Sequence, residues 1–407
     1  MSQNGGRAMT KLVRDPQLEE LVKELNRSDA PPEAPAGASV EELAESSWPA
    51  ALVPAENPIE PLLNDMARRN ASDLLILAGT KPIFRVMGRL VLAEHEALSA
   101  EDVQSLLAMF MTRPIRKRVN EEGASDFSVR LANPPMRFRV NIHRQRGTLA
   151  AAIRALPSAV PTLAELNLPQ TLAELVKTTR GLVLVCGPTG AGKSTTLAAL
   201  VGELNRNESR HIITIEDPIE YEHKNNRSVI EQIEIGRDAP SFASALRAAL
   251  RQAPDVILVG EMRDLETVAT ALTAAETGHL ILSTLHTSDA AQAIHRIIDV
   301  FPPAQQTQIK LQLALSLNGI VVQQLVPRSD GTGRSVAVEV LLASHAVRNH
   351  IRNDKLQNLI SEITLGKRQG MISLEDSLAR LVKQGAITVE DARIRSSRPD
   401  ELDSLLR

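Results

Sequence analysis

Residues 183–196 read VLVCGPTGAGKSTT, in which an apolar run is followed by three glycines, a lysine and several hydroxyl side chains. An apolar run typical of a buried strand stops at a glycine, and GPTGAGKS then matches the pattern GxxxxGK[ST] between a predicted strand and a predicted helix. Glycines let a backbone turn tightly and direct its N–H groups at phosphate oxygens. The positive end of the following helix dipole favours the same anion. The stretch therefore predicts binding of a nucleoside triphosphate.

The residues expected to hold the nucleotide follow from this pattern. Lys193 is predicted to contact the β- and γ-phosphates, and the Ser194 hydroxyl is predicted to ligate Mg²⁺. The full set is Gly187, Pro188, Thr189, Gly190, Ala191, Gly192, Lys193, Ser194 and Thr195.

Four apolar runs between residues 162 and 345 predict the sheet to which this loop belongs. They read GLVLVC, HIITIE, DVILVG and HLILST, and helical sequence separates them. Strands that are apolar throughout, with helices between them, are typical of a parallel sheet covered on both faces. We therefore expect an α/β ATPase-type domain over 162–345.

Acidic and histidine side chains follow the other three strands, and ligands of open α/β sheets bind beyond the carboxyl ends of strands. Glu216 and Glu220 are both candidates for the base that orients or deprotonates the attacking water, and the sequence does not separate them. Glu261 is predicted to join Ser194 in the magnesium shell, partly through water. His286 is predicted to sense the γ-phosphate.

The remaining sequence divides into three further segments. Residues 1–56 are predicted to form a flexible extension rich in Pro, Ala and Glu, with one amphipathic helix over 16–27. Residues 57–155 are predicted to form a small α+β domain, in which MRFRVNIHRQR alternates between apolar and charged faces. Residues 346–407 are predicted to form helices that end in a polar tail.

Composition excludes several classes of function. The net charge is −3 and only 8 of 407 residues are aromatic, which offers little to a nucleic acid. Cys186 is the only cysteine, so no intramolecular disulfide and no cysteine zinc site is expected. The same cysteine count predicts a cytoplasmic protein. The longest uncharged stretch, 311–327, is too short to span a bilayer, so any membrane association is expected to be peripheral.

Four ordered motifs carry a resemblance to a known family. GPTGAGKSTT, ITIEDPIEY, DVILVGEMRDLET and TGHLILSTLHT resemble the corresponding motifs of PilT-type ATPases in the secretion-ATPase superfamily, and the likeness covers about 57–395. It implies a PAS-like domain over 57–155, a RecA-like ATPase domain over 162–345 and a homohexameric ring that hydrolyses ATP. It further implies type IV pilus retraction, twitching motility, and peripheral attachment to the inner membrane through a pilus platform protein and, indirectly, the pilins.

The resemblance also implies that arginines of the N-terminal domain complete the nucleotide site, which makes Arg139 and Arg154 candidates. The single cysteine argues against assembly and secretion ATPases, which commonly carry a tetracysteine zinc element. AVRNHIRN, 346–353, resembles the AIRNLIRE motif of the retraction branch, with His350 and Asn353 as departures. Two alternatives stay open: an assembly or type II secretion ATPase, and a nucleotide-binding regulatory paralogue with little turnover that shares the machine with another ATPase.

Overall fold

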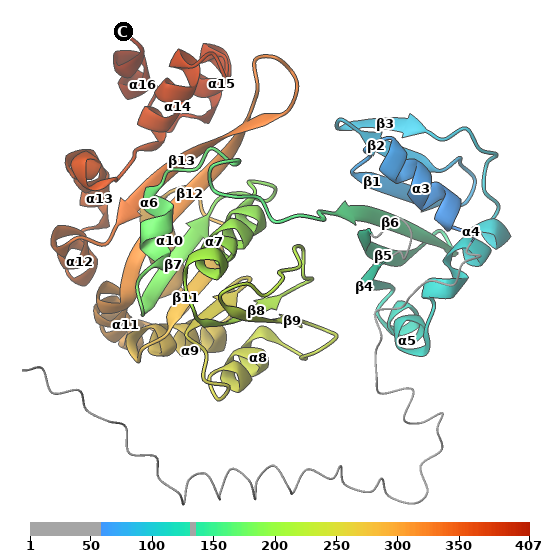
Figure 1. Ribbon diagram of the computed structural model, residues 1–407, viewed down its shortest axis with the longest axis horizontal. Helices are drawn as coiled ribbons and strands as arrows, with labels where there is room; N and C mark the ends of the chain where they lie inside the picture. The colour runs from blue at the N-terminus through green and yellow to red at the C-terminus, as the bar shows by residue number, and fades with distance from the viewer. Residues whose placement is uncertain (1–57, 131–135) are drawn as a thin grey trace, which may run out of the picture. The chain divides into compact units, whose positions relative to one another are not determined.

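The computed structural model describes residues 58–130 and 136–407 (Figure 1). The predicted extension over 1–56, with its predicted helix over 16–27, lies outside the described residues.

The first part of the described chain contains a six-stranded antiparallel sheet in the order β3-β2-β1-β6-β5-β4. Its strands are β1 (Asp73–Leu77), β2 (Ile83–Val86), β3 (Arg89–Leu92), β4 (Ala124–Arg130), β5 (Arg137–Gln145) and β6 (Thr148–Leu156). Its helices are α3 (Glu60–Arg68), α4 (Ala100–Leu107), the 3-10 helix η1 (Ala108–Phe110) and α5 (Arg113–Glu121).

Two local sequence signals explain elements of this sheet and its helices. The alternation in β5 buries Phe138, Val140 and Ile142 completely against the helices, as predicted. Ser99 caps α4, because its hydroxyl accepts from the Asp102 N–H while the Asp102 carboxylate accepts from the Ser99 N–H. The α+β character of this region follows from both signals, and its PAS-like assignment stays a prediction.

The second sheet has seven strands in the order β13-β12-β7-β11-β10-β8-β9. All neighbours are parallel except β12 and β13. The strands are β7 (Gly181–Cys186), β8 (His211–Glu216), β9 (Val229–Glu234), β10 (Val256–Val259), β11 (Leu280–Leu285), β12 (Leu317–Pro327) and β13 (Arg334–Leu342).

Helices cover both faces of this sheet, as the apolar runs predict. On β7, Val183 and Val185 face one side and pack with apolar residues of α6 (Thr171–Val176) and α7 (Lys193–Asn207). Leu182 and Leu184 face the other side. That side is covered by α8 (Phe242–Ala249), α9 (Leu265–Glu276), α10 (Ala290–Asp299) and α11 (Pro303–Ser316) (Figure 1). The parallel α/β architecture is confirmed.

The four predicted strands correspond to β7, β8, β10 and β11, and the sheet contains three further strands, β9, β12 and β13, that the apolar runs did not indicate. β9 has the sequence VIEQIE, in which polar residues interrupt the apolar run, and it lies at the sheet edge. β12 follows α11 without a break, because the helix ends at Ser316 and the strand begins at Leu317. A helix that passes directly into a strand leaves no turn residue to mark the boundary.

Helices complete the chain after β13. They are α12 (His345–Arg352), η2 (Leu356–Asn358), α13 (Leu359–Leu365), η3 (Gly366–Gln369), α14 (Leu374–Lys383), α15 (Val389–Arg395) and α16 (Pro399–Leu406). The predicted polar tail is wrong, because α16 is a regular helix whose Leu402 is fully buried against this group. Across the described ranges, none of the helices combines the length and apolarity that crossing a membrane requires.

Candidate active site

The phosphate loop connects β7 to α7 at the centre of the second sheet. Gly187 and Gly192 have φ values of 141° and 87°, which side-chain-bearing residues rarely adopt. At Gly187 there is a further constraint, since a Cβ atom would lie 2.3 Å from the carbonyl oxygen of Gln323. The glycines of the motif are therefore required both by backbone conformation and by close packing against β12.

Lys193 begins α7, and only 8% of its surface is exposed. Its Nζ donates to the carbonyl oxygens of Gly187 at 2.9 Å and Pro188 at 3.1 Å, so the ammonium lies against the loop itself. Burial lowers the pKa of Lys193, and the nearby carboxylates of Glu261 and Glu220 oppose that effect. The ammonium is thus positioned beside both the loop and the acids of neighbouring strands.

His286 lies between Lys193 and Glu261. Its Nδ1 is 3.4 Å from Lys193 Nζ, and its Nε2 is 4.0 Å from Glu261 Oε2. Burial lowers the pKa of His286, and the positive charges of Lys193 and Arg263 lower it further. The imidazole is therefore neutral at pH 7, and we assign its proton to Nε2 because Nδ1 faces an ammonium donor.

Glu261 follows β10, and its side chain is 19% exposed. Its Oε1 forms an ion pair with Arg263 Nε at 2.7 Å, while Oε2 faces His286. Arg263 is mostly exposed, so this ion pair holds the carboxylate only loosely. Glu261 remains able to exchange its arginine partner for another cation.

Glu216 ends β8, and this residue is half-buried. Its Oε1 accepts from Thr214 Oγ1 at 2.7 Å and from Gln232 Nε2 at 3.3 Å. Burial raises the pKa of Glu216 to about 7, although these hydrogen bonds act in the opposite direction. Glu220 lies half-buried one turn further along the loop, where its charge acts on Lys193. The two candidate bases therefore occupy different environments.

The register of the sheet explains why these groups meet. β11 pairs with both β7 and β10, and β10 pairs with β8, all in parallel. Their carboxyl ends consequently share one edge, where the phosphate loop, Glu216, Glu261 and His286 follow the four strands.

The two arginines that the family resemblance implies for the nucleotide site, Arg139 and Arg154, form ion pairs within their own sheet. Arg139 Nε lies 3.5 Å from Asp126 Oδ1, and Arg154 Nε lies 2.8 Å from Asp73 Oδ1. Both side chains are at least one-third exposed. The structure places neither beside the phosphate loop by a hydrogen bond or ion pair, and their role stays a prediction.

Sequence reasoning missed three residues that contact the motifs. Arg137 donates through Nη2 to the Ile219 carbonyl at 2.9 Å, and its Nη1 is buried without a hydrogen-bond partner among the described residues. Tyr221, the only tyrosine of the chain, lies 3.0 Å from Thr195 Oγ1 through its hydroxyl. Gln323 contacts the phosphate loop from β12. Only the alternation of β5 gave a signal, since it places Arg137 on the same face as Arg139.

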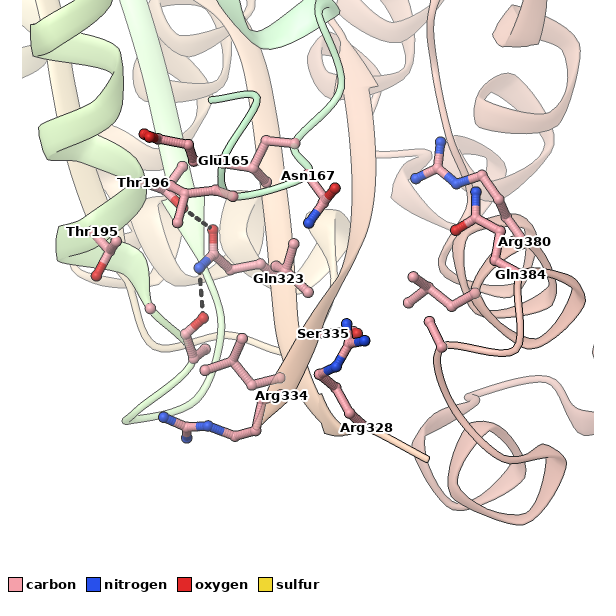
Figure 2. Close-up of a pocket in the computed structure, with 18 residues that line it drawn as sticks. Glu165, Asn167, Thr195, Thr196, Gln323, Arg328, Arg334, Ser335, Arg380 and Gln384 are labelled. Atoms are coloured by element: carbon pink, nitrogen blue, oxygen red, sulfur yellow. Dashed lines mark hydrogen bonds between the residues drawn. The ribbon is translucent and has the colours of Figure 1, made fainter. Parts of the chain in front are cut away.

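A cavity of about 530 Å³ opens beside the loop and α7 (Figure 2). Figure 2 shows Thr195, Thr196 and Gln323 on one side of it and Arg380 and Gln384 on the other. The polar and charged side chains that complete its lining are Glu165, Asn167, Arg328, Arg334 and Ser335. A volume of this size admits a drug-sized ligand.

A phosphate loop at the centre of a parallel sheet, with acids and a neutral histidine on the same edge, defines a P-loop nucleoside triphosphate hydrolase. Comparison with known proteins specifies the family. The family model for type II/IV secretion system proteins matches residues 50–393.

Two relatives from Pseudomonas aeruginosa span most of the chain. The type IV pilus retraction ATPase PilT is 43% identical over 342 residues, which cover 84% of this chain and 99% of the relative. The type IV pilus ATPase PilU is 41% identical over 348 residues, which cover 86% and 91%. A crystal structure of the pilus retraction motor PilT with bound ADP superposes with a TM-score of 0.80 at 45% identity, covering 86% of this chain and all of that one. The chain therefore belongs to the type II/IV secretion system protein family as a PilT-type ATP hydrolase.

Proposed function

We propose that this protein is a motor that uses ATP hydrolysis to withdraw type IV pili. The observation that carries the proposal is the group formed by the phosphate loop, Lys193, His286 and Glu261 on one sheet edge. This group of residues accounts for ATP hydrolysis. The similarity to pilus retraction ATPases over most of the chain indicates what the hydrolysis is used for.

The donor chemistry at the sheet edge fits Mg²⁺. Ser194 presents a hydroxyl in the first turn of α7, and Glu261 presents a partly exposed carboxylate. Magnesium prefers such oxygen ligands and completes its shell with water and substrate phosphates. When bound, it would neutralise charge on the phosphates. The residues of the chain orient the nucleotide around it, with Lys193 beside the β- and γ-phosphates.

We propose that Glu220 orients the attacking water and that Glu216, at the end of β8, supports Glu220. Glu220 and Glu261 are the carboxylates whose charges act on Lys193, whereas Glu216 already accepts two hydrogen bonds. A water beside the γ-phosphate needs an acceptor within hydrogen-bond reach whose lone pairs are not already taken by protein donors. Glu220→Gln should therefore reduce the rate of ATP hydrolysis more than Glu216→Gln, with ATP binding retained in both.

His286 is proposed to sense the γ-phosphate as a neutral donor. Its Nε2–H faces the same region as Glu261, and its depressed pKa keeps it uncharged beside Lys193. A neutral imidazole can donate its Nε2–H to a phosphate oxygen. After phosphate leaves, the Nε2–H can face the Glu261 carboxylate again.

The motor is proposed to work as a homohexamer, as the family resemblance implies. Arg139 and Arg154 stay candidates for completing a nucleotide site in that ring, and Arg137 joins them because its Nη1 is buried and has no hydrogen-bond partner in the described ranges. The proposed partners are an inner-membrane platform protein and, through it, the pilins. The protein would then be cytoplasmic and attached to the membrane peripherally through the pilus machine.

Near-equal identity to PilT and PilU supports a second candidate, an accessory ATPase that shares the machine with a principal motor. ATP hydrolysis by the purified protein distinguishes the two. An autonomous motor should turn over ATP with Mg²⁺ alone, and Lys193→Ala should abolish that turnover. A protein that binds ATP but hydrolyses it only with a paralogous ATPase would support the accessory role and contradict the principal one.

A further inference from the structure

Gln323 is a buried polar residue that none of the roles above uses. It lies in β12, next to β7, and only 1% of its surface is exposed. A buried amide costs free energy unless its polar atoms are hydrogen-bonded, so the partners of this side chain identify what it holds.

Both ends of the Gln323 amide bind the nucleotide-binding element. Oε1 accepts from Thr196 Oγ1 in α7 at 2.8 Å, and Nε2 donates to the carbonyl oxygen of Ala191 in the phosphate loop at 2.5 Å. Figure 2 shows both contacts, with the amide between the helix and the loop. A Cβ atom on Gly192 would also lie 3.2 Å from Nε2, so the amide packs directly beneath the last loop glycine.

These contacts fix the orientation of one peptide group. In a trans peptide the C=O of one residue and the N–H of the next point in opposite directions. Because the Ala191 carbonyl points at Gln323, the N–H of Gly192 points away from β12. Gly192 is the N-cap of α7, where free N–H groups and the helix dipole favour an anion.

We propose that Gln323 is a positioning residue that holds the 191–192 peptide so that the Gly192 N–H faces the β-phosphate of the nucleotide. Thr196 fixes which way the amide lies, because its hydroxyl donates to Oε1 and leaves Nε2 for Ala191. The side chain thereby links β12 to the loop across 132 positions of sequence.

Three substitutions in the full-length protein test this role. Gln323→Met keeps the approximate shape and removes both hydrogen bonds. Gln323→Glu keeps an acceptor for Thr196 but places a carboxylate oxygen against the Ala191 carbonyl. Thr196→Val removes the hydroxyl that orients the amide. Gln324→Met is the matched control, since Gln324 is the next residue of the same strand and faces the other side of the sheet.

The measurement is the dissociation constant for ADP and for AMP, which lacks the β-phosphate. Loss of a buried hydrogen bond of this kind should weaken ADP binding about tenfold in Gln323→Met. AMP binding should change much less, because only ADP contacts the Gly192 N–H in this proposal. Gln323→Glu should weaken ADP binding further, Thr196→Val should have an intermediate effect, and Gln324→Met should match the wild type.

Two results would overturn the inference. The first is wild-type ADP affinity in both Gln323→Met and Thr196→Val. The second is an equal loss of ADP and AMP binding, which would indicate a general packing defect. The inference rests on nucleotide binding by the loop and not on pilus retraction, so a protein that binds ADP normally but fails to retract pili would leave it intact.

Discussion

Replacing Glu216 by glutamine should stabilise the protein while slowing its chemistry. Glu216 has a pKa of about 7 because burial disfavours its charged form, compared with 4.5 for an exposed glutamate. The folded protein therefore binds this proton more tightly than the unfolded chain. With respect to this group, stability is greatest below pH 4.5, falls as the pH rises towards 7 and is constant above.

The size of the effect follows from those two values. At 1.36 kcal/mol for each pH unit between 4.5 and about 7, the charged carboxylate costs about 3 kcal/mol above pH 7. Glutamine carries no charge, and its amide oxygen still accepts from Thr214 and Gln232. Glu216→Gln should therefore exceed the wild type in stability by up to about 3 kcal/mol at pH 8 and by little at pH 4.5.

Urea unfolding followed by circular dichroism at pH 5 and pH 8 measures the difference. Glu339 also has a pKa raised to about 7 by burial, so the wild-type profile contains two contributions and the variant should remove only one. Glu220→Gln is the control and should reduce the pH dependence only slightly, because the charge of Glu220 is a small contribution to the raised pKa of Glu216 beside burial. Equal stabilisation of Glu216→Gln at both pH values, or none at pH 8, would refute charge burial at this site.

Three further predictions concern separate parts of the molecule. Lys193→Ala should abolish ATP hydrolysis in a phosphate-release assay, and normal turnover would contradict the loop assignment. Arg398→Ala should lower the free energy of unfolding by about 3 kcal/mol in chemical denaturation, because it leaves the fully buried Glu375 without its cation. Arg393→Ala, which breaks an exposed pair with Asp403, should cost less than about 1 kcal/mol, and equal losses in the two variants would argue against the buried pair. The Cys186 thiol, buried with its pKa raised to about 12, should react with a thiol reagent only after unfolding, and rapid reaction of the native protein would show that β7 is accessible.

The central strands and the phosphate loop could be predicted because their signals are local. Each strand is an uninterrupted apolar run, and the loop is one contiguous motif, so both are visible without knowledge of distant contacts. The shared carboxyl edge followed from the rule that parallel strands present their ends together. The positions of Glu261 and His286 needed only this rule, because each lies within two residues of the end of its strand.

Contacts between distant segments could not be predicted in the same way. Gln323 reaches Thr196 from 127 positions away, and nothing in QQLVP distinguishes it from Gln324. The raised pKa of Glu216 depends on burial at the end of β8, against the hydrogen bonds from Thr214 and Gln232, so spacing alone left Glu216 and Glu220 equivalent. In β5, alternation identified the charged face but not that Arg137, rather than Arg139, contacts Ile219.

The most direct test of the proposed function is surface piliation and twitching motility in a strain that lacks this gene. Complementation with the wild-type gene and with Lys193→Ala separates hydrolysis from the mere presence of the protein. If the protein is a retraction motor, the deletion strain should carry abundant surface pili and should not twitch. The wild-type gene should restore twitching, and Lys193→Ala should not. Absence of pili in the deletion strain, or restoration of twitching by Lys193→Ala, would contradict retraction driven by ATP hydrolysis at this site.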